Sequence, residues 1–537
     1  MIDLQQEGQR ERRSLLARAG VVGAGTLVSR LLGLGRDMVL AAVFDRDATD
    51  AWWVAFTIPN SLRQLLGEGA VSSAVVPILS EKLAKEGDGP AQAFFSRVRG
   101  VSLIALAVAS TLGVLFARQL TELFAGGYRD RPGELERTVT LTRWVFPYLL
   151  CIGTAALGMA ALNAKRRFAV ASFAPGLLNV GIIASALALP ATLAASGHDV
   201  ALALPIGALV GGVLQVMAQA PALRAIGFAA WPRFEVDDEV RKVFRRIAPL
   251  TLGIGIYSID LVISRRFLSG LGSGAQSYFS WAMRICDFPQ GIFVMALSTA
   301  ALPSLSTLAA RGATREVAET WAHGMSLALF VALPASAVLV VLGEPVVVAL
   351  FQRGAFDARA AHETARALLW QGGAVWTVAA VRQTIPALYA LGDTRSPVAV
   401  SALDLAAFIA LAVSLRSPMG HAGISAAVAG SSAVQMVLLL VALKGRMGTI
   451  CADVLARSAA RTLAASLLAS GAGWMAVRYT SGAAAALGSL GRLVPGISAL
   501  AVFSVTFVLA SRTLRSPELA EISGAMRRTL TRRMNLR

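Results

Sequence analysis

The chain has 537 residues, of which 55% are hydrophobic and only 15% are charged. Its mean hydropathy is +0.63, whereas soluble globular domains are about a quarter charged. Apolar runs of around twenty residues recur along nearly the whole length, so the composition excludes a soluble globular protein and predicts an all-α polytopic membrane protein. A β-barrel is disfavoured because its strands would be short and alternating.

The net charge of +18 does not indicate nucleic-acid binding, because Lys and Arg gather at the ends of the apolar runs as topology signals. Basic residues cluster before the first run and around 82–99, 165–167, 233–246 and 444–461, and the intervening loops are poorer in positive charge. This alternation predicts that both termini are cytoplasmic. No cleavable signal peptide is expected, because no small-residue cleavage site follows a short apolar core.

Taken in chain order, the apolar runs predict about fourteen transmembrane helices by the length needed to cross a bilayer. The predicted spans are 17–44, 51–80, 97–120, 139–163, 170–194, 201–224, 243–268, 275–308, 320–343, 361–391, 397–415, 422–443, 455–478 and 490–511. The motifs GLGRD, IPNSL, DFPQG and LPSLS are expected to interrupt or bend their helices, which is tolerated where backbone lines a cavity.

An internal repeat relates the two halves of the chain. The segment TDAWWVAFTIPN, which begins at Thr49, resembles AQSYFSWAMRICDFP, which begins at Ala275. At a near-constant offset, Pro77 then aligns with Pro303 and Arg167 with Arg395. Six predicted spans separate the copies, and an even number gives both copies the same orientation. The sequence therefore predicts two parallel-repeat six-helix lobes around a central cavity, plus two C-terminal helices.

This organisation divides the chain into four predicted parts. They are an N-lobe over 1–235, a C-lobe over 236–450, the last two helices over 451–515 and a basic cytoplasmic tail over 516–537. The tail is expected to lie against anionic lipid headgroups. Two like-oriented lobes are suited to alternating access, with the substrate site where the lobes meet.

Charged side chains fall inside several predicted spans, where each costs roughly 2.5–3.5 kcal/mol on insertion scales. The residues are Arg30, Arg36, Asp37, Arg63, Glu68, Arg284 and Asp287. Because such charges usually face a bundle interior, we expect the four arginines to line the cavity and bind an anionic, phosphate-bearing substrate. The structural alternative is that the arginines pair with Asp37, Asp50, Glu68 or Asp287 and lock helices together.

Two further acids, Asp260 and Asp404, are a candidate metal site for a coupling Na⁺, or could carry H⁺; alternatively they pair with Arg265 or Arg382. The three cysteines and four histidines are scattered and show no metal-ligand spacing. No cofactor is expected, and the absence of a phosphate-loop motif argues against nucleotide hydrolysis.

The segment SRLLGLGRD at 29–37, followed by ATDAWWVAFTIPNSLRQLLGEGAVSSAVVPILSE, resembles the signature of the MurJ (MviN) family. That family comprises lipid II flippases of bacterial cell-wall synthesis, within the multidrug/oligosaccharidyl-lipid/polysaccharide exporter superfamily. The likeness covers essentially the whole chain and recurs at SWAMRICDFPQGIFVMALSTAALPSLS and FAPGLLN.

The resemblance implies that the cavity residues engaging the substrate diphosphate are Arg30, Arg36, Asp37, Arg63 and Arg284. It also implies a groove for the polyprenyl tail over 455–511. Some members of the family bind Na⁺ in the C-lobe, and only the acidic residues Asp260 and Asp404 match that site in this chain. Gln64 stands where many members have a second Arg, and Asp287 stands where Glu is common. The first departure weakens any requirement for paired arginines at that position.

The expected function is that of a flippase, not an enzyme, moving undecaprenyl-diphosphate-linked disaccharide-pentapeptide (lipid II) to the outer leaflet of the bacterial inner membrane. The membrane potential is expected to drive export of the substrate or to reset the emptied carrier. Expected partners are lipid II, membrane lipids and cell-wall synthesis proteins, and no nucleic acid. One alternative is a flippase for another lipid-linked oligosaccharide. A second is a drug/cation antiporter of the same superfamily, and its cavity should be acidic. A third is a membrane-embedded transferase, which would need a carboxylate or His base.

Overall fold

A computed structural model of the chain describes residues 2–63, 70–484 and 488–524, and the regular structure in these ranges is entirely helical. The chain divides into two compact units, Met1–Gln276 and Ser277–Arg537. The all-α fold predicted from the sequence is therefore confirmed. The predicted boundaries at 235, 450 and 515 stay predictions.

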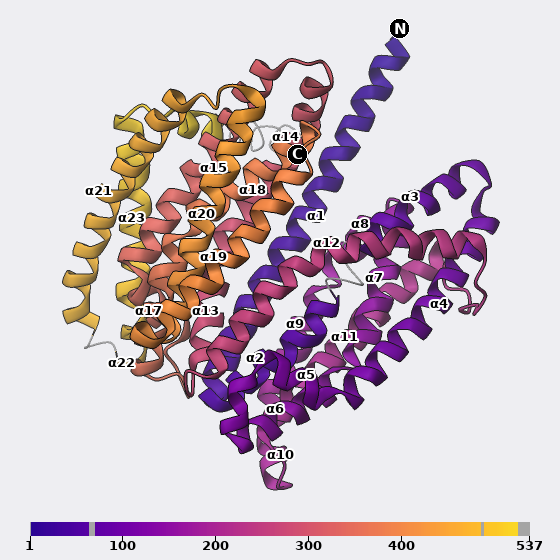
Figure 1. Cartoon of the computed structure of the whole chain (residues 1–537), viewed down its shortest axis with the longest axis horizontal. Helices are drawn as coiled ribbons and strands as arrows, with labels where there is room; N and C mark the ends of the chain where they lie inside the picture. The colour runs from indigo at the N-terminus through magenta and orange to yellow at the C-terminus, as the bar shows by residue number, and fades with distance from the viewer. Residues whose placement is uncertain (1, 64–69, 485–487, 525–537) are drawn as a thin grey trace. The chain divides into compact units, whose positions relative to one another are not determined.

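The first unit begins with a long helix, α1, drawn in indigo in Figure 1. Its helices are α1 (Ile2–Val43), α2 (Arg46–Arg63), α3 (Ala70–Lys85), α4 (Asp88–Leu115), α5 (Ala117–Phe124), α6 (Pro132–Val145), α7 (Tyr148–Ala164), α8 (Phe168–Phe173), α9 (Gly176–Ala188), α10 (Pro190–Ala195), α11 (Ala203–Ala225) and α12 (Asp238–Ser269), with the 3₁₀ turns η2 (Gly126–Asp130) and η3 (Val200–Leu202). Helix α9 contacts both α1 and α11, and α12 contacts α3, α4 and α5.

Glycines bring α9 and α11 into close contact. A Cβ on Gly181 would lie 2.4 Å from the Gly211 nitrogen, and one on Gly211 would lie 2.7 Å from the Leu178 Cα. Only hydrogen fits at these positions, so the two backbones touch directly, as small residues allow in membrane helix pairs. The core beside them contains Trp52 and Phe56, whose rings stack with centroids 4.8 Å apart.

The second unit is also built of helices. They are α13 (Ala275–Pro289), whose first two residues belong to the first unit, the π-helical turn η4 (Gln290–Val294), α14 (Met295–Ala310), α15 (Thr314–Val341), α16 (Gly343–Phe351), α17 (Ala358–Gly373), α18 (Val375–Ala390), α19 (Arg395–Met419), α20 (His421–Met447), α21 (Ala452–Ala484), α22 (Gly488–Gly491) and α23 (Leu493–Thr513). Helices α21 and α23 pack side by side, and both contact α15 (Figure 1).

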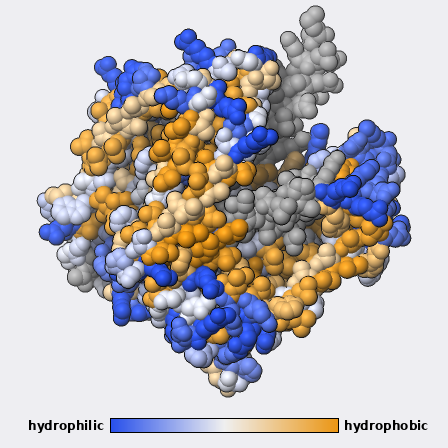
Figure 2. Space-filling model, viewed as in Figure 1, coloured by the Kyte–Doolittle hydropathy of each residue, from blue (hydrophilic) through white to orange (hydrophobic). Residues whose placement is uncertain are grey.

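Seven helical segments in the described ranges are long and apolar enough to cross a membrane. They are Asp88–Leu115, Pro132–Ala164, Val200–Ala225, Thr314–Val341, Arg395–Met419, His421–Met447 and Leu493–Thr513. On the visible face, hydrophobic residues gather along the helices and hydrophilic residues near their ends (Figure 2). The protein is therefore a multi-pass membrane protein.

Proline explains how one predicted span differs from the observed helices. The predicted span 170–194 is divided into α8, α9 and α10, with Pro175 and Pro190 at the two joins. Proline lacks the backbone N–H that would continue the helix, so it stands at or next to the first residue of a new one.

The four interrupting motifs behave differently from one another. Helix α1 runs without interruption through GLGRD, α2 through IPNSL and α14 through LPSLS. At DFPQG the prediction is confirmed, because α13 ends at Pro289 and the π-helical turn η4 follows. Among these motifs, the α-helix ends at Pro289 but continues through Pro59 and Pro303.

Candidate substrate-binding site

The Arg36 and Asp37 side chains form a buried ion pair on α1. Arg36 Nη2 lies 2.6 Å from Asp37 Oδ1, and Arg36 Nε donates to the same oxygen at 2.9 Å. The Arg36 side chain is 7% exposed and that of Asp37 is fully buried. This is the pairing that the structural alternative predicted for Arg36.

Asn179 on α9 completes the environment of this pair. Its Oδ1 accepts from Arg36 Nη1 at 3.2 Å, and its Nδ2 donates to the Ser29 carbonyl oxygen at 3.1 Å. The amide therefore connects α9 to two turns of α1. A buried charge held by hydrogen bonds on several sides fixes the helix register more than it offers a contact to a ligand.

Arg30 and Arg63 are more accessible than Arg36. Arg30 is half-buried on α1, and Arg63 is half-buried at the last residue of α2. Arg63 Nε donates to Asn60 Oδ1 at 2.9 Å, one turn earlier on the same helix. Glu68, the predicted supporting acid, lies outside the described residues.

Arg284 lies on α13, in the second unit, beside Asp287. Arg284 Nη1 is 3.9 Å from Asp287 Oδ2, and the two side chains are 37% and 46% exposed. An ion pair at this separation between partly exposed groups contributes little to stability. The guanidinium therefore keeps surface through which an anion could approach it.

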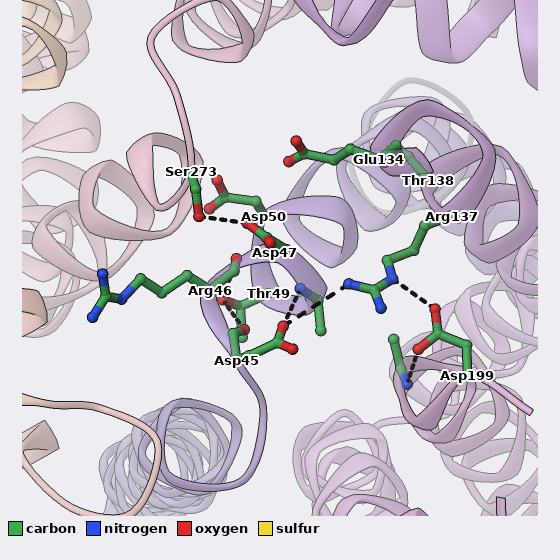
Figure 3. Close-up of polar contacts among 12 residues, drawn as sticks. Asp45, Arg46, Asp47, Thr49, Asp50, Glu134, Arg137, Thr138, Asp199 and Ser273 are labelled. Carbon is green, nitrogen blue, oxygen red and sulfur yellow. Dashed lines mark hydrogen bonds and ion pairs between the residues drawn. The ribbon is translucent and has the colours of Figure 1, made fainter. Parts of the chain in front are cut away.

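Asp50 is fully buried and connects two segments of the first unit (Figure 3). Its Oδ2 accepts from the Gly274 backbone nitrogen at 2.7 Å, and the neighbouring Asp47 accepts from Ser273 Oγ. The beginning of α2 is thereby tied to the turn between α12 and α13. We name the contacts of Asp47 and Asp50 with Ser273 and Gly274 the α2 tether.

Charged residues beside the α2 tether were not singled out by the sequence. Arg137 Nε donates to Asp199 Oδ2 at 2.6 Å, and Arg137 Nη1 lies 4.0 Å from Asp45 Oδ1 (Figure 3). Asp45 Oδ1 also accepts from the Ala48 backbone nitrogen at 2.7 Å, as a helix N-cap does. An aspartate three residues before Ala48, directly ahead of α2, could have predicted the N-cap role of Asp45 from the sequence. No local sequence pattern predicts that Arg137 pairs with Asp199.

Tyr128, in the η2 turn, is another buried polar residue near the α2 tether. Burial raises the pKa of its phenol well above the ordinary value, and the Asp50 carboxylate raises it further. The phenol is therefore neutral at physiological pH. The Arg131 guanidinium lies 5.0 Å from the centre of its ring.

The two candidate cation ligands belong to different units. Asp260 lies half-buried on α12 of the first unit, and Asp404 lies half-buried on α19 of the second. Asp404 Oδ1 is buried and accepts no hydrogen bond from the described residues. Within those residues no group of three or more His, Cys, Asp or Glu side chains could hold a metal ion.

The family of the chain follows from a comparison with known proteins. The family model described as "Lipid II flippase MurJ" matches residues 40–494. The chain belongs to the MurJ family. A relative from Bdellovibrio bacteriovorus, named as a probable lipid II flippase MurJ, is 32% identical over 458 residues, which is 84% of this chain and 86% of the relative.

Solved structures agree with the MurJ assignment at the level of the fold. An inward closed structure of lipid II flippase MurJ covers 92% of this chain and 99% of its own, with a TM-score of 0.72 and 20% identity. An inward-facing multidrug transporter of the MATE family and MOP superfamily covers 79% and 95%, with a TM-score of 0.67 and 13% identity. The family match includes Asp50, Arg63 and Arg284, whereas SRLLGLGRD precedes it.

Proposed function

We propose that this chain is a lipid II flippase, which carries the lipid-linked peptidoglycan precursor from the inner to the outer leaflet of the bacterial inner membrane. The observation that carries the proposal is the family match over residues 40–494, together with a 32% identical relative of that name. As a transporter it would move its substrate without changing it covalently.

The proposed substrate contact is between arginines and the diphosphate of the substrate. Arg30, Arg63 and Arg284 are each partly exposed, so their guanidinium groups can reach a ligand. Guanidinium binds phosphate bidentately and stays charged at every physiological pH. Arg36 and Asp37 would act indirectly, by holding α1 against α9.

The energy source that we propose is the membrane potential. A diphosphate is negative, and moving each negative charge out of a negative interior is favoured by about 2.3 kcal/mol per 100 mV. The basic clusters at the ends of the apolar runs support cytoplasmic termini. Helices α21 and α23 would hold the polyprenyl tail.

A coupling cation is a further part of the proposal, supported by the buried Asp404 Oδ1 that accepts no hydrogen bond from the described residues. Asp404→Asn keeps the shape of the side chain and removes its charge. We expect transport in vesicles to lose its dependence on external Na⁺ in this variant. The same Na⁺ dependence in the variant and the parent would refute the cation site and leave the flippase proposal standing.

Complementation tests the function itself. In cells depleted of their own lipid II flippase, expression of this chain should restore growth and keep lipid II from accumulating. Arg315→Ala, on the exposed surface of α15, is a control that removes an arginine without touching the proposed contacts. Failure to restore growth, combined with export of a different lipid-linked oligosaccharide, would favour the alternative substrate.

A further inference from the structure

A cavity in the first unit lies between α4, α7 and α11, away from the arginines assigned to the substrate. Its volume is about 140 Å³, which is the size that accommodates a benzene ring or a phosphate group. The residues that line it include Phe95, Arg99, Thr154, Gly158, Gln219 and Arg224.

A residue with a buried side-chain amide is among those that line this cavity. Gln219 on α11 is 1% exposed, and neither its Oε1 nor its Nε2 has a hydrogen-bond partner in the described part of the chain. A buried polar group without a partner is destabilising, so such a group in a native protein requires an explanation. The amide carries one acceptor and one donor group, and the described residues satisfy neither of them.

The charge of the cavity is positive. Arg99 on α4 and Arg224 on α11 both line it, and no described lining residue is acidic. Arg99 Nη1 donates to the Ala230 carbonyl oxygen at 3.3 Å, which holds the guanidinium at the wall of the cavity. Two guanidinium groups beside a neutral amide suit a phosphate ester that also carries hydroxyl or ester oxygens.

The segment 229–236, between α11 and α12, closes one side of the cavity through Ala229. It is bound to α4, since Ser96 Oγ donates to the Trp231 carbonyl oxygen and the Arg233 nitrogen donates to the Ser96 carbonyl oxygen at 3.0 Å. Trp231 and Phe234 are nevertheless 90% and 62% exposed. Exposed aromatic side chains at the ends of membrane helices are typical of residues that lie in the headgroup layer.

We propose that this cavity binds the headgroup of an anionic phospholipid from the leaflet that covers segment 229–236. Its phosphate would bind Arg99 and Arg224, and its glycerol or headgroup oxygens would bind the Gln219 amide. Trp231 and Phe234 would enter the same leaflet. Such a lipid would hold α4, α7 and α11 together at their basic ends, independently of the transported substrate.

Gly158 offers a way to block the cavity without changing its charge. A Cβ at Gly158, on α7, would lie 2.3 Å from Gln219 Oε1. Gly158→Ala therefore pushes the amide out of position while favouring the helix through its propensity. Gln219→Leu keeps the side-chain volume and removes the hydrogen bonds. Arg241→Gln, on the exposed beginning of α12, is a control substitution outside the cavity.

The test measures lipid retained by the full-length protein. The protein is placed in nanodiscs of phosphatidylglycerol and phosphatidylcholine in equal amounts, and retained lipid is quantified by native mass spectrometry. We expect selective retention of phosphatidylglycerol, reduced about tenfold in Gln219→Leu and Gly158→Ala, as for loss of hydrogen bonds to a charged group. Arg241→Gln should retain the parental amount.

Three results would overturn the proposal. One is equal retention of the two lipids by the parent protein, and another is unchanged phosphatidylglycerol retention in both cavity variants at parental thermal stability. The third is displacement of the lipid by millimolar inorganic phosphate, which would make the cavity a site for a free anion. If Gln219→Leu does not fold, the Gly158→Ala result decides.

Discussion

At the residue scale, Asp37 is the buried ion-pair partner of Arg36, and its replacement is expected to lower the free energy of unfolding. Asp37→Ala would leave a guanidinium that is 7% exposed without its carboxylate. Breaking a buried ion pair by removing one partner costs about 3–5 kcal/mol. We expect Asp37→Ala to lower the thermal unfolding midpoint of the purified protein strongly.

Asn179→Ala provides the comparison for Asp37→Ala, because it removes one neutral hydrogen-bond partner of Arg36 and leaves the ion pair intact. Its cost should be smaller, about 1–3 kcal/mol. An Asp37→Ala protein as stable as the parent would show that the Arg36–Asp37 pair does not hold α1 in place.

Asp393, in the turn between α18 and α19, gives a pH-dependent prediction outside the membrane spans. Its carboxylate accepts from the Ser396 nitrogen at 2.9 Å and from Arg446 Nε at 2.8 Å. The hydrogen bonds from Ser396, and then Arg446, lower the pKa of Asp393 to about 2. Because the folded pKa lies below the unfolded value, the stabilisation is complete above about pH 4 and is lost as the pH falls towards 2.

The variant Asp393→Asn removes this contribution. We expect the parent to be more stable than Asp393→Asn by about 1–2 kcal/mol at pH 7, as for loss of charge-assisted hydrogen bonds. The difference in unfolding midpoint should shrink between pH 4 and pH 2. A difference that grows over that range would contradict the assigned direction of the pKa shift.

At the scale of elements, the contact between α9 and α11 depends on glycine. A Cβ at Gly181 would meet the α11 backbone at 2.4 Å, and backbone cannot move aside as a flexible side chain can. We expect Gly181→Ala to lower the unfolding midpoint by the equivalent of about 1–3 kcal/mol, as overpacking does. Gly471→Ala on α21, where nothing lies within 4 Å, should be neutral or stabilising.

Helices were predictable from the sequence where apolar runs are continuous. The predicted span 397–415 lies within α19, and 422–443 within α20. Each run is apolar over most of its length and has no proline beyond its first residue. Local breaks were harder to predict, since Pro175 directly precedes the first residue of α9 while Pro303 lies inside α14. The outcome at each proline depends on packing neighbours and not on the local sequence.

At the scale of the whole molecule, the motifs identified the family, while the side-chain partners came only from the structure. The motif SRLLGLGRD contains the charged residues Arg30, Arg36 and Asp37. It gives no indication that Asn179, far along the chain, binds Arg36. The α2 tether joins Asp50 to Gly274, which lies 224 residues further along the chain, and no sequence pattern predicts that contact. Periodicity and composition predict helices, whereas pairing of distant polar groups requires the tertiary fold.

The proposed binding of the lipid II diphosphate by partly exposed arginines during export can be measured in cells. The most direct measurement is the fraction of lipid II accessible at the outer face of cells in which this chain is the sole flippase. For Arg284→Ala and Arg30→Ala, inserted at parental levels, we expect a fall of about tenfold or more, with lipid II retained on the cytoplasmic face. Parental outer-face lipid II in both variants would contradict it.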